Sequence, residues 1–140
     1  EALAKTPAPK IYICNVMTQP GETDGYTASD HLRALVAHGG KTIDYAVVNT
    51  GPVPSRLRVR YLQLGANPVA ADLEAIEKLG IHAVGDDLVQ RTEVVRHHPD
   101  KLAQAVLRLT FSGRGQHDRV RYLNGRSKDG KGPELSRAEI

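Results

Sequence analysis

The sequence contains a single cysteine, no tryptophan and few aromatic residues of any kind (4%). Because one cysteine cannot form an intramolecular disulfide, Cys14 favours a reducing, cytoplasmic environment. The absence of CxxC and HxxxH spacings argues against a zinc site. GxSxG and Walker patterns are also absent, so neither an esterase nucleophile nor a P-loop is predicted. No apolar run approaches the roughly 18 residues of a membrane helix, and we therefore expect no contact with a membrane.

The net positive charge is concentrated towards the C-terminal end of the sequence. Residues 1–112 contain 12 basic and 12 acidic residues, whereas residues 113–140 contain 7 basic and 4 acidic ones. We therefore predict a globular part over 1–112 and a basic, glycine-rich C-terminal tail over 113–140, whose composition is typical of disorder. The neutral globular part argues against nucleic acid as a partner; binding of nucleic acid through the tail is the alternative. Contacts with another domain or subunit could hold the tail, and we expect a homo-oligomer.

The first residues, EALAK, resemble the last turns of a helix that Pro7 and Pro9 end. They lack an initiator methionine and an N-cap. We therefore expect the sequence to be the C-terminal portion of a longer protein.

Predicted strands and helices alternate along the rest of residues 1–112. Thr27 and Asp30 are spaced as a capping box at the start of the first long helix, and Asp72 precedes a shorter helix as its expected cap. Alternation of this kind predicts an α/β fold with a mostly parallel sheet and helices on both sides. The strands are expected at 10–16, 43–48 and 81–84, with a short one possible at 67–70, and the helices at 28–38, 55–64, 73–79 and from Pro99 to near Phe111.

Polar residues follow three of these strands. They are Asn15, the pair Asn49-Thr50 and the pair Asp86-Asp87. Since parallel strands deliver their following loops to one edge of the sheet, these residues are expected to converge on a ligand site. The alternative is that they only form turns and caps, where Asn, Thr and Asp are common.

The connection from Met17 to Tyr26 is longer than the usual two to six residues between a strand and a helix. Gly21 and Gly25 would let its backbone approach a ligand, and the helix that follows would favour an anion such as phosphate at its N-terminus. Glu22 and Asp24 are negative, however. A Mg²⁺ ion that bridges a carboxylate and a diphosphate would reconcile these features, and Asp24 is the candidate metal ligand.

Three other groups of residues have less specific interpretations. His31 could take part in acid–base chemistry, but it also fits a partly buried helical residue with a local hydrogen bond. Cys14 fits a packed side chain on a buried strand better than a nucleophile. Three arginines in the second helix, spaced two apart, are expected to be solvated: Arg56, Arg58 and Arg60.

Three segments together resemble the bacterial gluconeogenesis factor family, which is related by fold to the 2-phospho-L-lactate transferases. The segments are CNVMTQPGETDGYTASDHL at 14–32, IDYAVVNTGPVP at 43–54 and VRHHPDKLAQAVLRL at 95–109. The resemblance covers about residues 1–111. It implies a Rossmann-like three-layer sandwich with a mostly parallel sheet, which here would lack its N-terminal, glycine-rich half.

The resemblance also implies a cytoplasmic protein that binds a nucleotide sugar of the UDP-N-acetylglucosamine type and regulates carbon metabolism and cell shape. The alternative is an enzyme similar to 2-phospho-L-lactate transferase, which would transfer a phosphorylated group with Mg²⁺; the family has no settled catalytic activity. Ligand-binding positions carried over from the resemblance are Asn15, Thr18, Gln19, Gly21, Glu22, Thr23 and Asn49.

Overall fold

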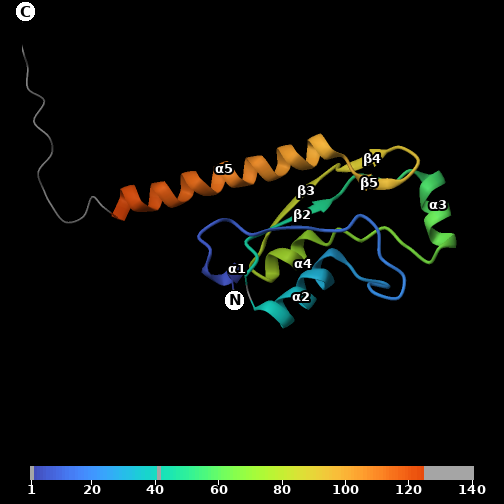
Figure 1. Ribbon diagram of the computed structural model, residues 1–140, viewed down its shortest axis with the longest axis horizontal. Coiled ribbons are helices and arrows are strands. Elements are labelled where there is room, and N and C mark those ends of the chain that lie inside the picture. Colours follow the sequence, from blue (N-terminus) through green and yellow to red (C-terminus); the bar gives the residue numbers. More distant parts are fainter. Residues whose placement is uncertain (1, 41, 125–140) are drawn as a thin grey trace, which may run out of the picture.

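Figure 1 shows a computed structural model of the chain, in which residues 2–40 and 42–124 are described. Five helices and five strands follow one another in these residues. The helices are α1 (Ala2–Lys5), α2 (Ala28–Gly39), α3 (Ser55–Gln63), α4 (Leu73–Lys78) and α5 (Pro99–Asn124). The strands are β1 (Ile11–Ile13), β2 (Tyr45–Asn49), β3 (His82–Asp86), β4 (Val89–Arg91) and β5 (Val95–His97).

The main sheet has three parallel strands in the order β1-β2-β3. Ile11 pairs with Tyr45 and Tyr45 with His82, so the three strands run side by side from the same level. The prediction of an α/β fold with a parallel sheet is confirmed. Parallel strands also confirm that the carboxyl ends of β1, β2 and β3 meet at one edge.

Helices cover both faces of this sheet, as expected (Figure 1). Alternate residues of β2 enter two different cores. Ala46 and Val48 pack with Leu32 of α2 and Ile76 of α4 on one face. Val47 packs on the other face, where α5 contributes its apolar stripe. The central strand is therefore buried on both sides, which accounts for its nearly continuous apolar sequence.

Four predicted elements differ from the structure. The strand expected at 10–16 is shorter, because β1 spans only Ile11–Ile13. α5 begins at Pro99 as predicted but continues past Phe111 to Asn124. Glycines after Phe111 suggested a stop, but each lowers helix stability by only about 1 kcal/mol, and most residues around them are compatible with a helix. The disorder expected from residue 113 onwards is therefore wrong for 113–124, while residues 125–140 lie outside the described part. Residues 67–70 form two isolated bridges, Met17 with Pro68 and Thr27 with Ala70, in place of a strand.

The β4–β5 hairpin was not predicted. Val89 pairs with His97 and Arg91 with Val95 in an antiparallel ladder. The turn between them contains none of the Asn-Gly or Asp-Gly pairs that mark tight hairpins, and each strand has only three residues. Sequence periodicity cannot identify strands this short.

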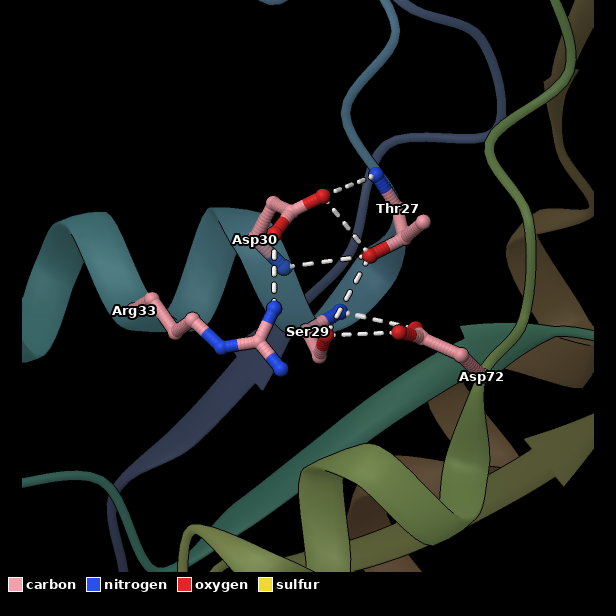
Figure 2. A network of polar contacts seen from close by, with 5 residues as sticks. All are labelled: Thr27, Ser29, Asp30, Arg33 and Asp72. Atoms are coloured by element: carbon pink, nitrogen blue, oxygen red, sulfur yellow. Dashed lines mark hydrogen bonds and ion pairs between the residues drawn. The ribbon is translucent and has the colours of Figure 1, made fainter.

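The first turn of α2 is held by a polar network that reaches α4 (Figure 2). Thr27 and Asp30 form the predicted capping box, in which each side chain accepts a hydrogen bond from the other residue's backbone N–H. Asp72 was expected to cap α4, but its side chain makes no bond there. Its carboxylate instead accepts hydrogen bonds from the backbone N–H of Ser29 at 2.9 Å and from the Ser29 hydroxyl at 2.5 Å.

The ionised form of Asp72 is favoured by this network. Burial alone would raise the pKa of its carboxyl group, but the hydrogen bonds from Ser29 and Thr27 outweigh burial and lower the pKa. Asp72 therefore links the N-terminus of α2 to the start of α4 as a charged group. Charge-assisted hydrogen bonds of this kind are stronger than neutral ones.

None of the helices in residues 2–40 and 42–124 combines the length and apolar character needed to cross a membrane.

We predict that Asp72→Ala lowers the free energy of unfolding of the full chain by about 1–3 kcal/mol, because it leaves two donors of Ser29 without their acceptor. Thermal or urea unfolding measures this change. The matched control is Glu74→Ala, which removes an exposed carboxylate two residues away on α4. Equal stability of the two variants would show that the Asp72 link does not stabilise the fold.

Candidate functional site

The ends of β2 and β3 carry polar residues that bond to one another. The Asn49 side chain accepts a hydrogen bond from Leu88 N–H at 2.9 Å and donates one to the Gly51 carbonyl at 2.7 Å. Lys101 of α5 donates to the backbone carbonyl of Asp87 at 2.9 Å and forms an ion pair with its carboxylate. A Cβ atom at Gly51 would overlap the Asp87 carboxylate, so glycine is required for this close approach. These residues hold the two loops together.

The loop after β1 is also stabilised by its own hydrogen bonds. Thr23 Oγ1 accepts from Gln19 N–H at 2.8 Å, and Asp24 Oδ2 accepts from Gly21 N–H at 2.7 Å. Gly21 has a φ of 81°, in the left-handed region that favours glycine. Thr18 is 4% exposed, and its hydroxyl accepts from Asn67 N–H at 2.9 Å. The side-chain oxygens of Thr18 and Thr23 are thus engaged in the fold.

Within the described residues, three of the predicted site residues keep side chains without a hydrogen bond or ion pair: Asn15, Gln19 and Glu22. All three are exposed. The first two lie at the end of β1 and the start of its loop, where a ligand could reach them. Their amide groups could donate and accept hydrogen bonds.

The helix that follows the loop does not offer the anion site expected at its N-terminus. Ala28 N–H donates to the Ala70 carbonyl, Ser29 N–H to Asp72 and Asp30 N–H to Thr27. These are the N–H groups that would bind an anion at a helix start. Figure 2 shows that two carboxylates, Asp30 and Asp72, already occupy this end. The expectation of a phosphate at the α2 N-terminus is therefore wrong.

A pocket of about 380 Å³ lies beside the end of β1. It brings together three predicted site residues, Asn15, Thr18 and Gln19, whereas Gly21, Glu22, Thr23 and Asn49 do not line it. Its other lining residues come from the same loop, from α3 and from β5: Val16, Met17, Tyr61, Val95, Arg96 and His97.

Tyr61, Arg96 and His97 were missed as site residues. Tyr61 lies on α3, and its hydroxyl accepts a hydrogen bond from Val95 N–H at 3.3 Å, which ties α3 to β5. Arg96 is exposed and brings a positive charge to the pocket. His97 and His98 preceded a proline and resembled the start of a helix, so the strand that contains His97 gave no separate signal.

The side chains of Cys14 and His31 are buried away from solvent. Cys14 has no exposed surface, and burial raises the pKa of its thiol to about 11, with a smaller contribution from Asp72. Its interpretation as a packed, unreactive side chain is confirmed. His31 is 7% exposed and makes a T-shaped contact with the Tyr26 ring, with ring centroids 5.3 Å apart. Burial lowers its pKa, and its Nε2 atom has no partner in the described residues.

The candidate metal ligand, Asp24, is exposed and uses one carboxylate oxygen for Gly21 N–H. The other oxygen and the carboxylate of Glu22 could contact a cation. Among the described residues, no cluster of three or more Asp, Glu, His or Cys side chains is placed to hold a metal ion. The arginines at 56, 58 and 60 are exposed, as expected.

Comparison with known proteins places this geometry in a family. Residues 1–89 match the family model described as 2-phospho-L-lactate transferase CofD. A gluconeogenesis factor from Bacillus subtilis is 41% identical over 111 residues, which is 78% of this chain and 35% of that protein. A gluconeogenesis factor from Halalkalibacterium halodurans is 42% identical over 109 residues, which is 76% of this chain and 34% of that protein.

A crystal structure of a UPF0052 family member from Bacillus halodurans has the same fold, with a TM-score of 0.73 and 42% sequence identity. The match covers 76% of this chain and 34% of that one. The chain thus spans about a third of the length of the relatives that it matches. On the family match and these identities, the chain belongs to the CofD/UPF0052 gluconeogenesis factor family.

Proposed function

We propose that the chain provides one wall of a nucleotide-sugar site in a cytoplasmic regulatory protein, with a ligand of the UDP-N-acetylglucosamine type. The observation that carries the proposal is the pocket at the end of β1, where the amide side chains of Asn15 and Gln19 have no partner among residues 2–40 and 42–124. The pocket also combines apolar residues with the charge of Arg96. Apolar walls with a few polar groups are typical of small-molecule sites.

The proposal includes a Rossmann-like domain that is completed by sequence outside this chain. The gluconeogenesis factors that support it are about three times as long as the matched segment. A role in carbon metabolism and cell shape and a homo-oligomeric state belong to the same proposal. Gly21, Thr23 and Asn49 would then support the site by shaping its loops.

The second candidate function is transfer of a phosphorylated group with Mg²⁺, which the name of the matching family model favours. The loop after β1 could contribute to such chemistry through the carboxylates of Glu22 and Asp24. Mg²⁺ is commonly held by one or two carboxylates together with substrate phosphates, so these two residues fit a shared ion. Their part would be to position the phosphates.

We predict that Gln19→Ala weakens binding of UDP-N-acetylglucosamine by the full-length protein about tenfold, because one ligand hydrogen bond is lost. Isothermal titration calorimetry measures the affinity. The melting temperature should stay nearly unchanged, since the Gln19 side chain has no bond within the described residues. The matched control is Gln104→Ala, an exposed glutamine on α5.

Equal affinity of Gln19→Ala and the control would contradict a role of the loop in binding. Saturable binding without release of UDP or sugar phosphate would exclude the transferase alternative. Turnover in the presence of Mg²⁺ would exclude the purely regulatory function.

We predict that EDTA weakens the same binding and that added Mg²⁺ restores it, if the loop carboxylates act through a shared cation. Asp24→Asn keeps an oxygen that can accept from Gly21 N–H but removes the charge, and it should make binding insensitive to EDTA. Asp100→Asn, which changes an exposed carboxylate at the start of α5, is the control. Affinity that EDTA leaves unchanged in the unmodified protein would rule out the metal.

A further inference from the structure

The solvent-facing side of α3 exposes apolar side chains. Val59 is 57% exposed and Leu62 is 46% exposed, and Leu64, which directly follows the helix, is 65% exposed. Val59 and Leu62 are three residues apart and therefore lie on one face of the helix. The opposite face is engaged in the fold, because Leu57 is buried and Tyr61 packs against a core cluster.

Three exposed arginines flank these apolar side chains: Arg56, Arg58 and Arg60. By their helical spacing, Arg56 and Arg60 lie on one side of the apolar stripe and Arg58 lies on the other. Arg60 donates a long hydrogen bond of 3.5 Å to the Glu93 carbonyl, but none of the three guanidinium groups forms an ion pair within residues 2–40 and 42–124. The sequence from 45 to 71 contains no Asp or Glu, so this part of the chain carries only positive side-chain charge.

An apolar centre with a rim of arginines is typical of a protein–protein interface, in which arginine is enriched. A two-fold contact of this surface with itself would bring the arginines of one copy towards those of the other, which disfavours a second copy. Interfaces with nucleic acid are more polar than this surface. Helices that lie on a membrane usually insert Trp or Phe, and α3 has neither.

We propose that this part of the molecule binds an acidic, amphipathic segment of another protein. The α3 surface is defined by Arg56, Arg58, Val59, Arg60, Leu62 and Leu64. Apolar side chains of the partner would cover Val59 and Leu62, and its carboxylates would form ion pairs with the guanidinium groups on both sides. The α3 surface faces away from the pocket, which Tyr61 lines from the inner side of the helix. The inference thus goes beyond the proposed function and does not depend on a nucleotide sugar.

The test uses a fluorescein-labelled peptide of about 16 residues, with Leu at positions i, i+3, i+4 and i+7 and Glu at the other positions. Fluorescence anisotropy measures its binding to the full-length protein. The unmodified protein should bind this peptide saturably and about tenfold more tightly than the same peptide with Lys in place of Glu. Added NaCl should weaken the binding, because salt screens exposed charges.

Leu62→Asp should weaken the binding about tenfold or more, because it places a carboxylate at the apolar centre of the α3 surface. The double variant Arg56→Glu/Arg58→Glu should reverse the preference and bind the Lys peptide more tightly than the Glu peptide. Leu35→Asp on α2, where Leu35 is 42% exposed, is the control for the apolar change. Arg108→Glu, at an exposed position of α5, is the control for the charge change.

Preferred binding of the Glu peptide that Leu62→Asp weakens and both controls retain supports the inference. Absence of saturable binding, or equal affinity for the two peptides, overturns it in the unmodified protein, so this arm does not depend on how a variant folds. Equal weakening in Leu62→Asp and Leu35→Asp places the peptide elsewhere and also overturns it.

Two further results would assign the α3 surface to another occupant and overturn the inference. One is Leu62-dependent binding of the full-length protein to phosphatidylserine vesicles without binding of the Glu peptide. The other is an oligomer of the unmodified protein that Leu62→Asp dissociates. None of these measurements includes UDP-N-acetylglucosamine, so failure of the inference leaves the proposed function standing.

Discussion

The carboxylate of Asp72 limits which groups near the loop after β1 could bind a ligand. It lies at the start of α4 but accepts both hydrogen bonds that Ser29 offers, so it joins α2 to α4 on one face of the sheet. Together with the Thr27–Asp30 capping box, it occupies the N–H groups of the first turn of α2. The carboxylates of Asp30 and Asp72 neutralise the positive end of the dipole of α2. The N–H groups of the first turn are therefore already bonded, and in the proposed function the ligand is bound by side chains of the loop instead.

The polar residues that follow the three parallel strands also differ in whether they bond within the fold. All three strands end in polar residues, but those after β2 and β3 bond to one another through Asn49, Gly51 and Lys101. After β1, the chain turns away and leaves space between its loop, α3 and the β4–β5 hairpin. Asn15 and Gln19, whose amide groups have no partner in the part of the chain that the structure describes, line a pocket there. The proposed site therefore lies at the end of β1.

Much of this fold could be predicted because its signals are local. The apolar run of β2 and the Thr27–Asp30 spacing each specify an element within a few residues. The role of Asp72 could not be predicted, because the donor that it meets is 43 residues earlier in the chain. The hairpin strands are too short for periodicity, and so His97 was missed as a site residue. Asn15 and Gln19 could be proposed from a family resemblance, but their freedom from internal bonds required the structure.

The central claim, that ligand binds at the β1 pocket and not at the start of α2, can be tested by mapping backbone amide shifts of the full-length protein during a titration with UDP-N-acetylglucosamine. The account predicts shifts in residues 15–19 and 95–97, with the amides of residues 28–30 unmoved. Shifts centred on residues 28–30, with none around the pocket, would contradict it.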